Sequence, residues 1–163
     1  MNEPALTLRE AKAMDCRFYW EVNNAPTTRA LSISPEPIPW ESHQAWYAAR
    51  LSNPQSRLYV ALIGDTSIGV IRFDLSDVEA VISVALSPEE QGKGYGRRII
   101  AMGTEHSLET FSIQRVLAYI RPNNVGSIRA FEAAGYTHVR HDTSQGLPME
   151  LYAATQTEAS RAS

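Results

Sequence analysis

The stretch PEEQGKGYGRR, residues 88–98, decides the fold of this chain. Gly92, Gly94 and Gly96 fall within five residues, Lys93 lies among them, and two arginines follow. Apolar, β-branched sequence precedes the segment, and a helix-like run follows it. Glycines allow the backbone to approach a ligand and to point successive N–H groups at it. A helix start adds unpaired donors and the positive end of a dipole, so the segment is predicted to hold a pyrophosphate.

The spacing of the glycines separates this segment from other phosphate loops. It lacks both the GxxxxGKS/T spacing of a P-loop and the GxGxxG fingerprint of a Rossmann fold. It reads Q-x-x-G-x-G over residues 91–96, and N-x-x-S-x-x-x-F-E-x-x-G-Y follows about thirty residues later, over residues 124–136. Together the two blocks resemble the signatures of the GNAT superfamily of N-acetyltransferases. The resemblance implies an enzyme that transfers acetyl to an amine, with acetyl-CoA as co-substrate.

Hydrophobic periodicity and turn residues predict the element order β-α-α-β-β-β-α-β-α-β-β. We expect strands over residues 5–11, 57–64, 67–75, 78–87, 114–121, 136–141 and 147–153. We expect helices over residues 11–23, 39–52, 95–110 and 125–135. Residues 24–39 are expected to be irregular, because prolines at 35, 37 and 39 exclude a helix there. The order matches the superfamily and implies an α/β (α+β) GNAT fold. That fold has a mixed, mostly antiparallel central sheet with a splayed strand pair and about four flanking helices.

Length and composition indicate the number of domains, the kind of partner and the cellular setting. The 163 residues favour one domain, which we expect over residues 1–153, with a disordered tail over 154–163. A net charge of −3 disfavours a nucleic-acid partner. The single cysteine, Cys16, fits a reducing, cytoplasmic setting. We expect no membrane association, since the sequence has neither a long apolar run nor a signal peptide.

The resemblance assigns most of the cofactor site. In the superfamily, the strand before the glycine segment splays from its neighbour and pairs its backbone with the pantetheine amides. The glycine segment holds the pyrophosphate, and the second block contacts the pantetheine. The cofactor-binding residues implied are Val84, Ala85, Leu86, Gln91, Gly92, Lys93, Gly94, Tyr95, Gly96, Arg97, Asn124, Ser127 and Phe131.

The general base cannot be carried over from the superfamily. Its members often place a glutamate on the central strand to take the amine proton, usually through water, and Val81 stands at that position. Alternation places residues 79, 81 and 83 on one face, so Glu79 and Ser83 are the candidates for a water relay. Each has a structural alternative: a surface carboxylate near a turn for Glu79, and a locally hydrogen-bonded serine for Ser83.

The general acid is also missing from its usual position. The superfamily's tyrosine that protonates the leaving thiolate is replaced by Phe131, which has no proton to give. Tyr136 is the catalytic candidate in its place, with Tyr119 and Ser127 as further possibilities, and the thiolate can also leave without help. Tyr136 fills a position where a core aromatic residue is usual, so packing is the alternative role.

The acceptor region has a pattern of its own. The spacings W-x-x-N-x-x-x-x-x-R over residues 20–29 and H-x-x-W-Y over 43–47 resemble a narrower branch. That branch acetylates the 4-amino group of nucleotide-linked amino sugars, as in pseudaminic-acid synthesis. Aromatic rings and arginines suit a base and a diphosphate. A ring amine is also less basic than the lysine amine, so more of it is neutral at pH 7. The absence of a strong general base therefore lowers the reaction rate less. The predicted substrate-binding residues are Asn23, Arg29, His43 and Arg72.

Two other functions stay open. The first is a protein N-terminal acetyltransferase of the ribosomal-protein type, and the second is a non-catalytic CoA-binding regulator, motivated by Val81 and Phe131. The expected partner is a small-molecule amine, possibly a nucleotide sugar, and the chain is expected to be a monomer or a homodimer. No metal site is predicted, because His138 and His141 are three residues apart and alternation points them to opposite faces.

Overall fold

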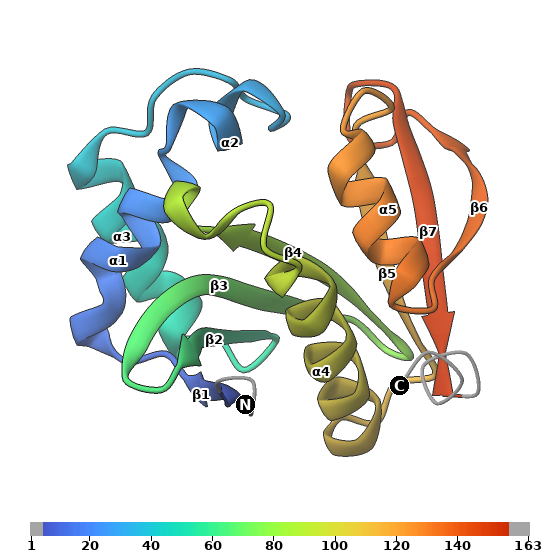
Figure 1. Ribbon diagram of the computed structural model, residues 1–163, viewed down its shortest axis with the longest axis horizontal. Helices are drawn as coiled ribbons and strands as arrows, with labels where there is room; N and C mark the ends of the chain where they lie inside the picture. Colours follow the sequence, from blue (N-terminus) through green and yellow to red (C-terminus); the bar gives the residue numbers. More distant parts are fainter. Residues whose placement is uncertain (1–4, 157–163) are drawn as a thin grey trace.

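The computed structural model describes residues 5–156 as a seven-stranded sheet with helices on both faces (Figure 1). The strands are β1 (Leu6–Glu10), β2 (Ser56–Ile63), β3 (Thr66–Leu75), β4 (Glu79–Leu86), β5 (Arg115–Ile120), β6 (Thr137–Asp142) and β7 (Met149–Thr155). The helices are α1 (Cys16–Asn23), α2 (Pro26–Ala30), α3 (Trp40–Ser52), α4 (Tyr95–Thr110) and α5 (Val125–Ala133), with 3-10 turns η1 (Ala13–Asp15) and η2 (Pro88–Glu90). In this part of the chain, no helix combines the length and hydrophobicity that a bilayer crossing requires.

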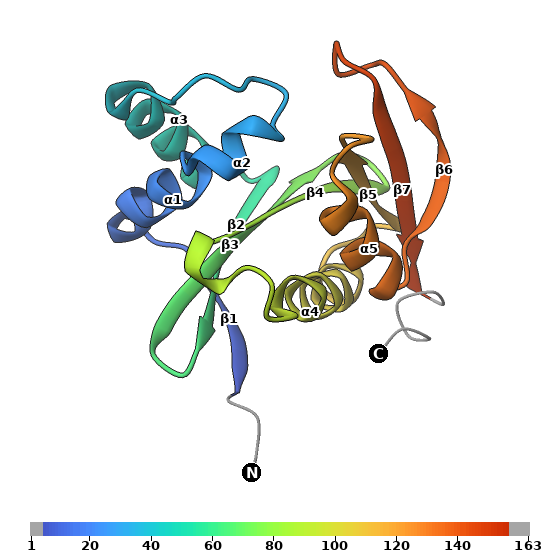
Figure 2. The ribbon, with the colours of Figure 1, turned by 45° about the horizontal axis from the view of Figure 1, so that its top comes forward.

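The sheet splits at its centre. The strand order is β1-β2-β3-β4-β5-β7-β6, and every pair is antiparallel except β4 with β5. The parallel pair is registered only from Glu79–Arg115 to Val81–Leu117, whereas β4 stays paired with β3 as far as Leu86. Beyond Val81 the two strands diverge, as both views show (Figures 1 and 2). The predicted GNAT fold, including its splayed strand pair, is confirmed.

Alternation along β2 and β3 directs side chains to two separate cores. Tyr59, Ile71 and Phe73 face the core under α4 and α5, where Ile99 and Phe131 are buried. On the opposite face, α1 and α3 bury their apolar residues against the sheet. That second core contains Tyr19, Val22, Tyr47, Leu58, Val60 and Val70. The helices that carry the acceptor region are therefore anchored to β2 and β3, on the opposite side of the sheet from α4.

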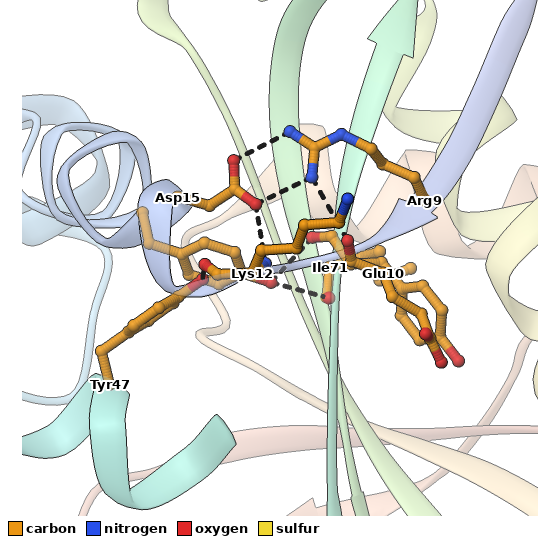
Figure 3. Close-up of polar contacts among 8 residues, drawn as sticks. Arg9, Glu10, Lys12, Asp15, Tyr47 and Ile71 are labelled. Atoms are coloured by element: carbon orange, nitrogen blue, oxygen red, sulfur yellow. Dashed lines mark hydrogen bonds and ion pairs between the residues drawn. The ribbon is translucent and has the colours of Figure 1, made fainter. Parts of the chain in front are cut away.

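A polar cluster fixes the start of α1 (Figure 3). Asp15 is 6% exposed and accepts hydrogen bonds from both terminal nitrogens of Arg9, each at 2.8 Å, and from the Lys12 backbone N–H at 2.8 Å. The hydroxyl of Tyr47 donates to the Lys12 carbonyl at 2.7 Å. The bond to Arg9 lowers the pKa of Asp15. These contacts join β1, η1 and α3, and so fix the position of α1 relative to α3.

Several boundaries differ from the predictions. The helix predicted over residues 11–23 begins only at Cys16, after the 3-10 turn η1. Residues 24–39 contain the short helix α2, which begins at Pro26 because proline suits the first helical position; the later prolines end it. β7 extends to Thr155, two residues beyond the predicted domain end at 153, because Ala154 and Thr155 pair with Val116 and Arg115. Residues 157–163 of the predicted tail lie outside the described part of the chain.

Candidate active site

The glycine segment forms the turn between β4 and α4. Gly92 and Gly94 adopt left-handed conformations, with φ of 78° and 83°, which residues with a side chain rarely tolerate. Gly94 is the N-cap of α4, and no side chain caps this 16-residue helix. No side-chain cap therefore occupies its first N–H groups, which suits the predicted pyrophosphate contact next to the end of β4.

The basic residues of the segment have local contacts. Lys93 pairs with Glu90 at 3.3 Å between Nζ and Oε2. The Arg98 guanidinium lies over the Tyr95 ring, 5.8 Å from its centroid, and Arg97 is exposed. Contact between any of these groups and the pyrophosphate stays a prediction. The glycine backbone is the part of the segment whose geometry is already suited to that ligand.

The splayed edge of β4 lies beside a pocket. Val84 and Ala85 line this pocket, and the strand edge next to them has lost its β5 partner. The Leu86 carbonyl accepts a hydrogen bond from Gln91 Nε2 at 3.4 Å, which ties the glycine turn to the strand end. This edge has the unpaired backbone that the predicted pantetheine contact requires, and the contact itself stays a prediction.

The second sequence block builds helix α5 and its contact with α4. Asn124 caps α5, its Oδ1 accepting from the Ser127 N–H at 3.2 Å. Phe131 is 5% exposed and packs edge to face on Tyr136, with ring centroids 4.9 Å apart. The capping role occupies the Asn124 oxygen. Cofactor contacts of Asn124, Ser127 and Phe131 stay predictions.

Tyr136 does not reach the splayed edge. The residue is 2% exposed, and its hydroxyl shares a 2.6 Å hydrogen bond with Thr104 Oγ1 inside the α4–α5 core. Burial raises the pKa of Tyr136, which makes the hydroxyl reluctant to release a proton. The structure therefore contradicts the prediction that Tyr136 protonates the thiolate, and its role is packing.

Glu79 is also placed away from the acceptor pocket. Its carboxylate forms an ion pair with Arg115 where β4 and β5 still pair. Ser83 lies four positions further along β4, which is about 13 Å in an extended strand. The prediction of Glu79 as a base is therefore contradicted: the alternation was right about the face but did not account for the distance or for Arg115.

A pocket of about 600 Å³ lies between the first three helices and the centre of the sheet, and we call it the acceptor pocket because the predicted acceptor residues line it. It brings together all four predicted substrate-binding residues with Ser83. The lining residues are Tyr19, Asn23, Thr28, Arg29, Ser32, Ser34, Ile38, Ser42, His43, Trp46, Val70, Arg72, Ser83, Val84 and Ala85. Because Val84 and Ala85 belong both to this lining and to the splayed edge, the pocket opens onto the predicted position of the pantetheine arm.

Arg72 is a cationic residue of the pocket whose guanidinium is held in place by two hydrogen bonds and by a ring contact. Its Nη2 donates to Ser83 Oγ at 3.2 Å, and its Nε donates to Asp74 Oδ2 at 3.0 Å. The guanidinium lies over the Trp46 ring, 5.2 Å from the centroid. Arg50 pairs with the other oxygen of Asp74. Two arginines thus share one carboxylate, so this part of the site carries a net positive charge.

His43 is a neutral imidazole in the pocket wall. It is 2% exposed, and its Nε2 lies 2.8 Å from the Cys16 carbonyl oxygen. A carbonyl can only accept, so Nε2 carries the hydrogen and Nδ1 is the acceptor nitrogen. Burial lowers the pKa of His43 below its ordinary 6.5. Near pH 7 the ring is therefore in its neutral form, with Nδ1 as its unprotonated nitrogen.

Arg29 closes the pocket on the side of α2. Its guanidinium donates to the backbone carbonyls of Glu36 at 3.1 Å and Asn23 at 3.4 Å, and also to the carbonyl of Ser34. Much of its donor capacity therefore holds the loop after α2. Arg29 still contributes positive charge to the lining, and a direct substrate contact stays a prediction.

Two large side chains of the pocket are absent from the predicted substrate-binding residues. They are Tyr19, which is buried in the wall, and Trp46, which is only partly buried and lies beneath Arg72. The signal for Trp46 was present, because it follows His43 by three residues and Ser42 by four, the spacings that bring side chains together on a helix. The smaller lining residues from α2 and its loop have no pattern that could have indicated them.

The splayed sheet, the glycine turn and the uncapped start of α4 together define an acetyltransferase fold. The chain belongs to the acetyltransferase (GNAT) domain family, whose model matches residues 5–137. It is an N-acetyltransferase that uses acetyl-CoA as co-substrate.

Known proteins with related sequences and folds use two kinds of acceptor. Spermidine N(1)-acetyltransferase of Vibrio cholerae serotype O1 is 21% identical over 142 residues, which are 83% of this chain and 81% of that protein. A crystal structure of spermidine N-acetyltransferase from Vibrio cholerae with CoA and spermine has a TM-score of 0.83 at 18% identity, covering 94% of this chain and 97% of that one. Aminoglycoside acetyltransferase AAC(6')-Ib with coenzyme A and kanamycin gives 0.85 at 19% identity, covering 96% and 98%. At these identities the structural likeness establishes the fold.

Proposed function

We propose that this enzyme acetylates the amino group of a nucleotide-linked amino sugar. The observation that carries the proposal is the charge of the acceptor pocket. Among the described residues that line it, Arg29 and Arg72 are cationic and none is an aspartate or glutamate. Such a lining attracts an acceptor that carries an anionic group, and the guanidinium fork of arginine matches the oxygens of a phosphate group.

The same charge disfavours polyamines and aminoglycosides as acceptors. Spermine and kanamycin carry several amino groups that are protonated near pH 7, and their binding calls for carboxylates. Two unit charges of like sign 4 Å apart repel by about 4 kcal/mol at the effective dielectric of a protein surface. Asp74, the carboxylate next to the lining residue Arg72, is shared between Arg50 and Arg72. The acceptor is therefore proposed to differ from those of the relatives named above.

The apolar part of the pocket supports a nucleotide. Trp46 is only partly buried and presents ring surface to the cavity, which suits stacking or edge packing against a base. Tyr19 also lines the cavity but is 1% exposed, with its hydroxyl engaged by the Tyr59 and Ile71 carbonyls at 2.7 and 3.1 Å, so it forms part of the wall. The volume of about 600 Å³ lies within the range of pockets for molecules of this size.

The proposed chemistry is direct attack of the amine on the thioester. The amine nitrogen forms a bond to the carbonyl carbon, the carbon–sulfur bond breaks, and coenzyme A leaves as a thiolate that takes a proton from solvent. The amine proton passes to His43 Nδ1, directly or through water. Of the described lining residues that titrate, His43 is the one whose ordinary pKa lies near neutrality. Ser83 accepts from Arg72, so its own hydroxyl hydrogen is free to orient that water.

A thiol-release assay with acetyl-CoA tests the acceptor. The panel is a nucleotide-linked 4-amino sugar, the same sugar without its nucleotide, spermidine, kanamycin and a peptide α-amine. We expect kcat/KM to be highest for the nucleotide-linked sugar and to fall about 100-fold without the nucleotide, because the diphosphate contacts are lost. A preference for spermidine, kanamycin or the peptide would overturn the proposal.

A further inference from the structure

The β6–β7 hairpin carries a side-chain cluster that lies outside the lining of the acceptor pocket. It consists of His138, His141 and Glu150. The prediction that the two histidines point to opposite faces is wrong, because β6 contains a bulge. His138 is opposite Tyr152, Arg140 is opposite Leu151, and the extra residue Val139 lies between them. One unpaired residue reverses the alternation, so residues three apart share a face.

The three side chains converge on each other. His138 Nε2 lies 2.6 Å from Glu150 Oε2, and His141 Nδ1 lies 2.6 Å from Glu150 Oε1. The imidazole centroids are 5.7 Å apart, and one ligand atom from each residue falls within 4.8 Å of the others. The two rings therefore direct a nitrogen toward the same carboxylate from neighbouring positions on β6.

The surroundings hold this arrangement in place. The Glu150 side chain is 13% exposed, and the His138 ring packs edge to face on Tyr152 at 5.2 Å. Arg140, the nearest cationic side chain along β6, pairs with Asp142 at 3.1 Å, and alternation places both on the opposite face. No arginine from β6 therefore competes for the face on which the cluster lies.

We propose that His138, His141 and Glu150 bind a divalent transition-metal ion of the zinc class. Two imidazole nitrogens and one carboxylate oxygen form a common zinc ligand set, with bonds of about 2.0–2.2 Å, and water completes the coordination. Tetrahedral ligands at these lengths lie about 3.3 Å apart, which small side-chain rotations reach from the present separations. His141, whose side chain is 86% exposed, leaves an open path for the ion.

The site is separate from the acceptor pocket, none of whose described lining residues comes from α5, β5, β6 or β7. The ion would link β6, the edge strand of the sheet, to β7. Because a ligand that binds only the folded state raises stability by mass action, zinc binding is expected to raise Tm. Turnover with saturating substrates is expected to stay unchanged.

Calorimetric titration of the metal-free full chain with Zn²⁺ at pH 7.5 tests the proposal, with Co²⁺ absorption to report coordination geometry. We expect one ion per chain, a rise in Tm, and loss of affinity by about tenfold or more in His141→Gln and in His138→Gln. His106→Gln is the matched control, because His106 lies on α4, where it contacts Tyr59 of β2 and Thr110 of the same helix. Absence of binding in the wild type, or equal binding in the His138→Gln/His141→Gln double variant, would overturn the proposal.

Discussion

Arg121, the residue after β5, donates a hydrogen bond from Nη1 to the backbone carbonyl of Ser32 at 2.9 Å, across 89 residues of sequence. Ser32 lines the acceptor pocket in the loop after α2. The bond therefore connects the half of the molecule that carries α1, α2 and α3 to the half that carries β5 and α5, on either side of the splay (Figure 2).

Arg121→Ala is expected to loosen this connection. Losing one charge-assisted bond at a partly exposed site removes about 1 kcal/mol, so we expect KM for the acceptor to rise about fivefold with little change in Tm. Steady-state kinetics with varied acceptor measures the effect. Arg129→Ala, which removes an exposed cation from α5, should leave KM unchanged, and an unchanged KM in Arg121→Ala would refute the connection.

Gly94→Glu is expected to abolish acetyl-CoA binding. The new carboxylate would repel the pyrophosphate, and a side chain at φ of 83° is strained by about 1–2 kcal/mol. Gly146→Glu is a matched control, because Gly146 has φ of 86° and open space around its Cβ position, as Gly94 does. Calorimetry should show at least about a 100-fold loss of CoA affinity in Gly94→Glu alone. Similar affinities in the two variants would show that the glycine turn does not hold the cofactor.

Arg72→Met is expected to damage acceptor recognition and to spare cofactor binding. Removing a guanidinium that contacts a diphosphate should lower kcat/KM for the nucleotide-linked sugar about 100-fold. Arg72→Lys should recover only part of this, because an ammonium keeps the charge but not the planar fork. If both variants kept wild-type kcat/KM, Arg72 would have only its structural role beside Asp74.

His43→Gln is expected to lower kcat about 100-fold and to flatten the acid side of the pH profile. Burial lowers the pKa of His43, and the neutral ring is the active form. Wild-type kcat should therefore fall as pH decreases through a value below 6.5. A pH–rate profile under saturating substrates measures this. The matching profile of His106→Gln should keep its acid limb, and an acid limb that persists in His43→Gln would assign it to another group.

Asp15→Asn is expected to destabilise the fold by about 1–3 kcal/mol, because Arg9 loses its charged partner next to a nearly buried site. The bond to Arg9 lowers the pKa of Asp15, so this contribution is complete above the ordinary 3.8 and is lost as pH falls through the folded value below it. Urea unfolding at pH 7 and pH 3 measures both effects. Asp65→Asn, in an exposed turn, should match the wild type, and an equal loss there would contradict the argument.

Most secondary structure could be predicted because its signals are local. Helix α4 begins and ends where the pattern placed it, and Gly135 follows α5 with φ of 100°, as a C′ glycine does. Helix α2 was missed because the prolines at 35, 37 and 39 dominated the segment, although Pro26 is a favourable first residue.

The roles of single side chains were less predictable, because they depend on partners distant in sequence. Tyr136 is withdrawn from catalysis by Thr104, 32 residues away. Glu79 is paired with Arg115, 36 residues away. Neither partner can be identified from the local sequence around the residue that it contacts.

By itself, the sequence determined the donor chemistry of this protein. Glycine conformations, helix starts and motif spacings act between residues that are adjacent in the chain, so the acetyl-CoA-dependent family could be identified from two short blocks. Only the tertiary structure decided the acceptor pocket and the histidine cluster. The pocket takes its charge from side chains on different helices and strands, and one extra residue in β6 turns two histidines to the same face, because strand register is set by pairing across the sheet.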